Sequence, residues 1–288
     1  MLAWKPHPLI IGPDMQNPIR QRLEEFKREG RLALVPFVPA GYPDLETTRR
    51  VLEVCDRAGA CVIEVGFPFS DPIADGPVIQ EAFTAALAKK LKTADVLRSV
   101  QEVSGKLSAP LVAMVSYSIV FRYGLARFLA DAKGAGFAGL ILPDLPPPEA
   151  EEVCRQVHAA GLETILLIAP TSTPVRRAEI TRLCTGFVYY LSVSGITGER
   201  DRLPSGLVEA VGEIKKITDV PVCVGFGLHK RQQIEDLAKF ADGAIVGSAI
   251  VRRMKEHSKE RPEGIADAVG EYLRELIGPP EGQKGSRV

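Results

Sequence analysis

Long hydrophobic runs are absent from this 288-residue sequence. The longest, around GLILP from Gly139, is far shorter than the ~20 apolar residues that cross a bilayer. Neither sign of charge is in excess, because 36 Lys and Arg residues balance 36 Asp and Glu residues, so a nucleic-acid-binding surface is not indicated. Residues 1–17 lack the apolar core and cleavage site of a secretory signal. We therefore expect a soluble, cytoplasmic protein.

Cysteine and histidine are also sparse. The four histidines form no metal-binding pattern, and the five cysteines are scattered and include no C-x-x-C pair. Neither a disulfide framework nor a metal site is indicated, and a reducing compartment suits the free thiols. Hydrophobic residues make up 45% and charged residues 25%, which is typical of a globular protein with ample material for a core.

Short apolar runs rich in β-branched residues recur along the chain. Eight of them begin at Leu32, Cys61, Leu111, Ala138, Glu163, Gly186, Val220 and Gly243. Segments with helical periodicity lie between them, such as residues 45–60 and 231–243, and most end at a glycine. Apolar strands that alternate with amphipathic helices indicate parallel strands buried on both faces.

Eight such units favour a single (β/α)8 (TIM) barrel over a doubly wound sheet, which usually has fewer strands. We expect an extra helix around Arg20 to Glu29 before the barrel and a closing helix around Ile265 to Ile277. The barrel domain then spans residues 18–277, between a flexible N-terminal extension (1–17) and a Pro/Gly-rich disordered tail (278–288). In this fold the functional site lies at the carboxyl ends of the strands.

The motif IEVGFPFSDPIADGP (63–77) places three carboxylates in an apolar, proline-rich stretch. Glu64 alternates with Ile63 and Val65, so we expect its side chain to point toward the barrel mouth. Desolvation there raises the pKa of a carboxyl group, which suits general acid/base catalysis near neutral pH. Asp75 lies in the following loop, where we expect solvent or backbone donors to keep it ionised. The two carboxylates would then divide proton transfer and charge stabilisation between them.

Each of these acidic residues has a purely structural alternative. Glu64 could form a buried salt bridge with a lysine or arginine. Asp71 precedes a proline, and that position is typical of a turn former. The motif therefore assigns catalysis to Glu64 and Asp75 and leaves Asp71 as a loop or partner-contact residue.

Glycine-rich segments follow the last three predicted strands. They are SVSGITGER (192–200), GFG (225–227) and GSA (247–249). Loops after the last strands of such barrels, together with a helix N-terminus, commonly bind phosphate through backbone N–H groups. GFG and GSA contain no lysine or arginine, so the pattern predicts a phosphate cradle of backbone donors to which Ser248 adds a hydroxyl. Any one of these glycines taken alone is better explained as a turn residue, and only the three segments together indicate a phosphate site.

Three aromatic residues, Phe37, Tyr189 and Phe226, also fall near predicted strand ends. Together they could line a flat apolar substrate pocket between the carboxylates and the cradle. Packing in the core is the alternative interpretation.

These motifs resemble the tryptophan synthase alpha chain family. The resemblance runs from ALVPFVPAGYPD (33–44) to GSAIV (247–251), and its most specific signature is IEVGFPFSDPIADGPVIQ. It implies a (β/α)8 lyase that cleaves indole-3-glycerol phosphate to indole and glyceraldehyde 3-phosphate in a retro-aldol reaction. It also implies no cofactor in this chain and a pyridoxal-phosphate-dependent beta chain as partner. The partner would take up the indole for tryptophan biosynthesis in an alpha2-beta2 heterotetramer.

The resemblance further implies roles for single residues. Glu64 matches the acid/base residue and Asp75 the carboxylate that pairs with the indole N–H. The other matches are the phosphate site (Gly198, Gly227, Gly247 and Ser248), the indole pocket (Tyr189 and Phe226), the mobile-loop threonine (Thr197) and the partner-facing loop (68–77). Two positions depart from the family pattern: Ser118 stands where asparagine is expected, and SVSGITG replaces the commoner S-x-T-G-V-T-G.

Two alternative functions remain open on the sequence. One is a non-catalytic regulatory subunit that binds and activates the beta chain, and lyase activity of the isolated chain would exclude it. The other is a sugar-phosphate isomerase or epimerase on the same barrel, which would bind an open-chain ketose phosphate in preference to an indole phosphate.

Overall fold

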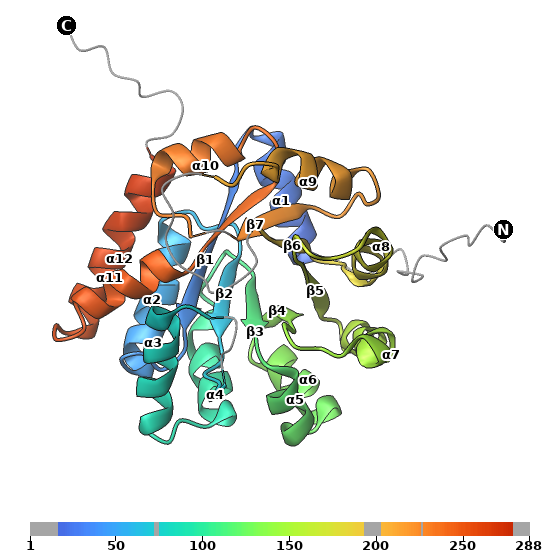
Figure 1. Ribbon diagram of the computed structural model, residues 1–288. Helices are drawn as coiled ribbons and strands as arrows, with labels where there is room; N and C mark the ends of the chain where they lie inside the picture. Colours follow the sequence, from blue (N-terminus) through green and yellow to red (C-terminus); the bar gives the residue numbers. More distant parts are fainter. Residues whose placement is uncertain (1–16, 72–74, 193–202, 226, 279–288) are drawn as a thin grey trace, which may run out of the picture.

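The eight predicted strands form a closed barrel in the computed structural model, which describes residues 17–71, 75–192, 203–225 and 227–278. Each strand lies parallel to the next one along the chain, and β8 closes the barrel by pairing with β1 (Figure 1). The strands are β1 (Ala33–Pro39), β2 (Ile63–Gly66), β3 (Leu111–Met114), β4 (Phe137–Ile141), β5 (Glu163–Ile168), β6 (Val188–Leu191), β7 (Val222–Gly225) and β8 (Gly243–Val246). The fold predicted from the sequence is confirmed.

Helices surround the barrel on its outer face (Figure 1). In the described part of the chain they are α1 (Pro18–Arg28), α2 (Leu45–Arg57), α3 (Pro77–Ala88), α4 (Thr93–Ser104), α5 (Tyr117–Tyr123), α6 (Leu125–Gly134), α7 (Pro147–Ala159), α8 (Pro174–Leu183), α9 (Leu207–Lys215), α10 (Arg231–Leu237), α11 (Ser248–Glu256) and α12 (Pro262–Ile277). None of these described helices reaches the length and apolarity needed for a bilayer-spanning segment.

The two helices expected outside the repeating units are present, but both begin earlier than predicted. α1 begins at Pro18 rather than Arg20, and α12 begins at Pro262 rather than Ile265. Proline suits the first helical position because its φ angle is already helical and its missing N–H would have no partner there. Asn17 completes the start of α1 by accepting a hydrogen bond from the Arg20 N–H at 2.8 Å.

The third strand is shorter than its apolar run suggests. It ends at Met114, because Ser116 caps a short helix, α5, that begins at Tyr117. A serine hydroxyl that accepts a backbone N–H at a helix start competes with continuation of the strand. The polypeptide therefore turns away from the barrel axis immediately beyond β3.

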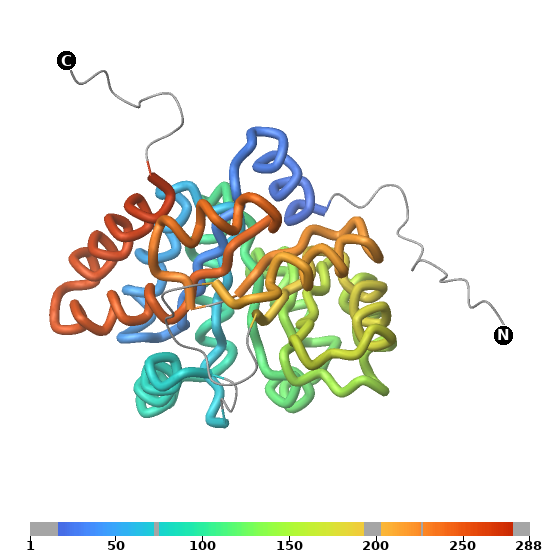
Figure 2. The backbone as a smooth tube through the Cα atoms, turned by 45° about the horizontal axis from the view of Figure 1, so that its top comes forward, coloured from blue at the N-terminus to red at the C-terminus, as the bar shows by residue number. Residues whose placement is uncertain are grey.

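The core has two layers. Alternate strand residues such as Leu34, Ile63 and Val65 pack outward against the helices. Their neighbours fill the barrel interior, and α1 closes its amino end with Ile19, Leu23 and Phe26. Figure 2 shows α1, in blue, set apart from the ring of the other helices. The amino end of the barrel is thus sealed by apolar side chains, which leaves the carboxyl end for function.

The apolar plug supplied by α1 predicts a specific loss of stability. Leu23 is 2% exposed, so Leu23→Ala should lower the free energy of unfolding by about 3 kcal/mol through lost burial and the remaining cavity. Urea unfolding followed by circular dichroism measures this. The exposed Glu24→Ala on the same helix is the matched control and should change stability by less than about 0.5 kcal/mol. Equal effects of the two substitutions would mean that α1 does not close the core.

Candidate active site

Glu64 lies inside the barrel, as its alternation with apolar neighbours predicts. In the β-sheet register it is level with Phe37 on β1 and Val112 on β3, and Val112 belongs to the interior layer. Val62, two residues before Glu64 and just ahead of β2, is also interior. The Glu64 side chain is fully buried. A carboxyl group therefore stands among apolar side chains in the barrel.

Burial decides the protonation state of Glu64. Desolvation, followed by the nearby charge of Asp75, raises the pKa of Glu64 from its ordinary 4.5 to about 8. Neither carboxyl oxygen has a hydrogen-bond partner among the described residues, and no cation contributes to the pKa. The buried salt bridge that the sequence left open is therefore not found in the described part of the chain. Glu64 is mostly protonated at neutral pH and can donate a proton.

Asp75 lies near Glu64, in the segment just before α3. The charge of Asp75 raises the pKa of both Glu64 and Tyr189, which places the three groups close together. Burial raises the pKa of Asp75 itself to about 6. The sequence predicted an environment of solvent or backbone donors, so the direction of this pKa shift was not foreseen. Asp75 nevertheless remains mostly ionised at pH 7, and the two carboxyl groups differ in protonation state.

Two aromatic rings lie close to glycine residues at the barrel mouth. A Cβ atom on Gly225 would lie 2.6 Å from the Tyr189 ring, and one on Gly66 would lie 2.4 Å from the Phe37 ring. Glycine at these strand ends lets each ring approach the backbone closely. Phe37 is level with Glu64 in the sheet, and the charge of Glu64 helps raise the pKa of Tyr189, so both rings lie near Glu64. Phe226, the third aromatic residue of the predicted pocket, lies outside the described residues.

Apolar residues that the sequence reasoning missed complete the walls. Met114, Leu167 and Leu191 each follow an interior residue of their strand by two positions, and each is only partly buried. Residues two apart on a strand share a face, so their spacing from Val112, Ile165 and Tyr189 could have predicted that they face the barrel interior. The barrel mouth therefore presents apolar side chains around two carboxyl groups.

The predicted anion cradle is partly described. α11 begins at Ser248, directly after β8, and no side chain caps its first turn. Gly247 accepts the N–H groups of Ile250 and Val251, while the first N–H groups of a helix have no intrahelical acceptor. A helix start with open N–H groups favours an anion. Gly227 lies two residues beyond β7, whereas Thr197 and Gly198 fall outside the described residues.

Other polar residues beyond the strand ends serve the scaffold. The Asp144 carboxylate, just after β4, accepts the Ser116 hydroxyl and the Tyr117 N–H, each at 2.6 Å. Ser118 shares a hydrogen bond of 2.7 Å with the Ser116 hydroxyl, so the serine at this unusual position joins the same small network. Asp71 is exposed, in keeping with a loop or contact residue.

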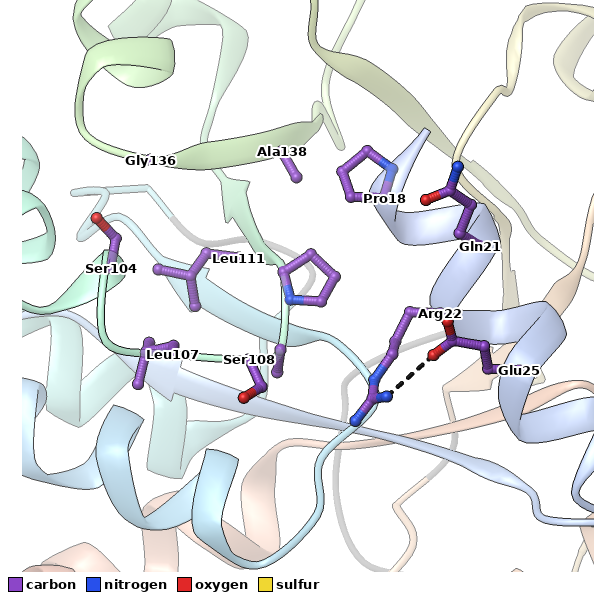
Figure 3. A pocket seen from close by; sticks show the side chains of 12 residues that line it. Pro18, Gln21, Arg22, Glu25, Ser104, Leu107, Ser108, Leu111, Gly136 and Ala138 are labelled. Atoms are coloured by element: carbon purple, nitrogen blue, oxygen red, sulfur yellow. Dashed lines mark hydrogen bonds and ion pairs between the residues drawn. The ribbon is translucent and has the colours of Figure 1, made fainter. Parts of the chain in front are cut away.

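A separate pocket of about 380 Å³ lies at the opposite end of the barrel. Figure 3 shows it between α1 and the segments that lead into β3 and β4, with Arg22 Nη1 3.0 Å from Glu25 Oε2. Leu111 and Ala138, which line it, stand at or near the starts of their strands. This pocket is therefore distinct from the site at the carboxyl ends.

Metal-ligating side chains do not cluster in the described residues: no group of three or more His, Cys, Asp or Glu there could hold an ion. All five cysteines are free and buried. Burial raises the pKa of the Cys61 and Cys154 thiols to about 12, so these sulfurs are protonated. The two carboxyl groups at the mouth can exchange protons with a bound molecule.

The fold and the site define an enzyme-type (β/α)8 barrel in which a carboxylate pair stands beside aromatic walls and an open helix N-terminus. The chain belongs to the tryptophan synthase alpha chain family, whose sequence model matches residues 23–276. The resemblance noted from the motifs is confirmed.

Individual relatives support this assignment. The tryptophan synthase alpha chain of Synechocystis sp. is 42% identical over 261 residues, which cover 90% of this chain and 98% of the relative. That of Thermoanaerobacter pseudethanolicus is 40% identical over 262 residues, or 91% and 100% of the two chains. Among solved structures, Mycobacterium tuberculosis tryptophan synthase matches with a TM-score of 0.81, 35% identity and coverage of 91% and 98%. The Pyrococcus furiosus tryptophan synthase alpha subunit matches with a TM-score of 0.80 and 35% identity, and the match covers 86% of this chain and 98% of that one.

The raised pKa of Glu64 predicts a pH-dependent cost in stability. Between about pH 4.5 and pH 8 the unfolded chain ionises Glu64 while the folded chain keeps it protonated, so stability falls as pH rises through this window. Glu64→Gln removes that term and should be more stable than the parent at pH 9 by about 2 to 5 kcal/mol, but nearly equal to it at pH 5.

Urea unfolding at the two pH values measures this difference. The control is Glu24→Gln on the exposed face of α1, which should follow the parent at both. A Glu64→Gln variant that gained no stability between pH 5 and pH 9 would contradict the raised pKa.

Proposed function

We propose that this chain is a carbon–carbon lyase, the alpha subunit of a tryptophan synthase, which cleaves indole-3-glycerol phosphate to indole and glyceraldehyde 3-phosphate. One observation carries the proposal: a fully buried, protonated Glu64 faces an ionised Asp75 between aromatic walls. Family membership supports the choice of substrate.

The two carboxyl groups suit the two proton transfers of a retro-aldol cleavage. Glu64 donates its proton to indole C3, and the resulting positive charge spreads to the ring nitrogen, where the Asp75 carboxylate stabilises it. Glu64 is now an ionised group in an apolar site and a stronger base than an exposed carboxylate. It removes the proton from the substrate hydroxyl next to the breaking bond. The C–C bond electrons return to the indole ring, and the hydroxyl becomes the aldehyde.

The remaining contacts hold the substrate in place. Phe37 and Tyr189 pack against the indole rings, as proposed from their positions beside Glu64. The phosphate binds at Gly227, Gly247 and Ser248, where the N-terminus of α11 supplies backbone N–H groups. Thr197, Gly198 and Phe226 are proposed to complete the site on the family pattern alone. Binding energy from the phosphate, which does not react, positions the scissile bond.

The apolar side chains at the barrel mouth favour an indole over a sugar as the bound molecule. Met114, Leu167 and Leu191 present apolar surface at the mouth, and an open-chain ketose phosphate would leave its hydroxyl groups without partners against them. This argues against the isomerase alternative. The carboxylate pair argues against a purely regulatory subunit.

We also propose that the partner is a tryptophan synthase beta chain in a cytoplasmic alpha2-beta2 complex. The retro-aldol steps need only proton transfer, so we propose no cofactor for this chain and assign pyridoxal phosphate to the partner. Two of the exposed large apolar side chains, Phe121 on α5 and Val175 on α8, are each 70% exposed and follow β3 and β5. Both therefore stand toward the carboxyl end, where Asp71 is also exposed, and they mark a surface for a partner.

The carboxylate roles predict the pH profile of the isolated chain. Activity needs Glu64 protonated and Asp75 ionised, so kcat/KM should be bell-shaped between about pH 6 and pH 8. Glu64→Gln should lower indole release by ~100-fold or more, because general acid/base catalysis typically contributes that much. Asp75→Asn should also be strongly impaired, and its alkaline limb should move to lower pH because the Asp75 charge helps raise the pKa of Glu64.

Indole release by the isolated chain, measured from pH 5 to pH 10, tests these expectations. Activity of Glu64→Gln within about tenfold of the parent would exclude the role given to Glu64. Tight binding of an open-chain ketose phosphate, without binding of indole-3-propanol phosphate, would favour the isomerase instead.

The apolar surface predicts how partner binding changes. Phe121→Asp should weaken binding of a tryptophan synthase beta chain at least tenfold, because it removes exposed apolar area and adds charge. Lyase activity of the isolated variant should stay near that of the parent. Ile217 is 49% exposed between α9 and β7, at the opposite end of the barrel, and Ile217→Asp is the control. Calorimetric titration that gives equal affinities for all three chains would exclude Phe121 from the interface.

A further inference from the structure

Gln80, in the first turn of α3, holds two consecutive carbonyl groups next to the proposed active site. Its side-chain Nε2 donates to the Asp75 carbonyl oxygen at 2.8 Å. Its backbone N–H donates to the Gly76 carbonyl oxygen at 3.0 Å. The same residue therefore fixes the orientation of the peptide groups on both sides of Gly76.

The need for such a contact follows from the local sequence. Pro77 has a fixed φ angle, so the chain is rigid from the start of α3 onward. Gly76 has no Cβ and permits wide rotation, and it provides no side chain to cap the helix. The Gln80 amide therefore restricts rotation of the peptide between Asp75 and Gly76, and with it the direction of the Asp75 side chain.

α3 is itself fixed relative to the strand that carries Glu64. Phe83, three residues after Gln80, packs edge to face against Phe37, with ring centroids 6.3 Å apart and an interplanar angle of 65°. The Phe37 ring in turn lies across Gly66, two residues beyond Glu64. Residues three apart on a helix share a face, so one face of α3 contacts both sides of the site.

We propose that Gln80 is a positioning residue, which aims the Asp75 carboxylate at the charge that develops on the bound ring during the reaction. This inference rests on the proposed lyase function. The helix α3 acts as a rigid spacer: Phe83 sets it against the Glu64 strand, and Gln80 sets Asp75 against the helix. The separation of the two carboxyl groups is then defined by packed side chains rather than by the loop alone.

The test compares Gln80→Leu with the parent chain in the indole-release assay. Leucine keeps much of the side-chain volume but cannot donate to the Asp75 carbonyl. We expect kcat to fall about tenfold or more, because a misplaced charge acts mainly on the transition state, while KM changes less than about threefold. The melting temperature should stay within a few degrees of the parent value.

The matched control is Gln156→Leu. The Gln156 amide donates to Glu152 Oε1 at 2.7 Å on the exposed face of α7, so this variant loses a comparable helix hydrogen bond far from the site. It should retain the parent kcat and KM. A second measurement places Gln80→Leu in the Asp75→Asn chain, where it should cause little further loss of kcat because the charge it positions is already absent.

Each outcome has a distinct meaning. A parent chain that releases no indole would refute the proposed function, whatever the variants do. With an active parent, Gln80→Leu with kcat within twofold of the parent would overturn the positioning role. An equal loss of kcat with and without the Asp75 carboxylate would also overturn it, because Gln80 would then act on the fold in general.

Discussion

The desolvation of the Glu64 carboxyl group is the constraint on which the rest of this site depends. Ionising it inside the barrel is unfavourable, and no cation or hydrogen-bond donor among the described residues offsets that cost. The group remains protonated at neutral pH, which makes it a proton donor, and becomes a strong base once the proton has left. A salt bridge would have stabilised the fold but would have kept Glu64 ionised. Burial of Glu64 without a charged partner therefore accounts for both the lost stability and the acid/base chemistry.

Much of the barrel serves to create that environment. α1 seals the amino end with apolar side chains, and the interior residues of the strands exclude water beneath Glu64. Gly66 and Gly225 admit aromatic rings at the mouth, where a Cβ atom would collide with them. Asp75 then supplies a second carboxyl group that is less perturbed and stays ionised at neutral pH. Two groups of the same chemical type thus hold different protonation states because their surroundings differ.

The sequence predicts the barrel and the place of Glu64 well, because both depend on local periodicity. Alternation of apolar residues along a strand determines which side chains share a face, and β2 is a short strand with an unambiguous pattern. The end of β3 at Met114 shows the limit of this reasoning, because the Ser116 cap of α5 interrupts the apolar run.

The upward pKa shift of Asp75 and the contact from Gln80 were not predictable in the same way. Both depend on where Asp75 and Gln80 lie relative to the barrel mouth, and the position of a residue in or next to a loop has no periodic signal in the sequence. The apolar side chains of Met114, Leu167 and Leu191 were partly predictable. Their spacing along each strand is visible in the sequence, but that they lie together follows only from the closed barrel.

The protonation state of Glu64 is the central claim, and it can be measured directly. Carbon-13 NMR of the folded chain labelled at glutamate side-chain carboxyl carbons, with the Glu64 signal assigned by its loss in Glu64→Gln, follows the titration of this one group. The structure predicts a midpoint near pH 8, well above the ordinary 4.5. A midpoint below about pH 5 would contradict the account, because Glu64 would then be ionised at neutral pH and have no proton to give.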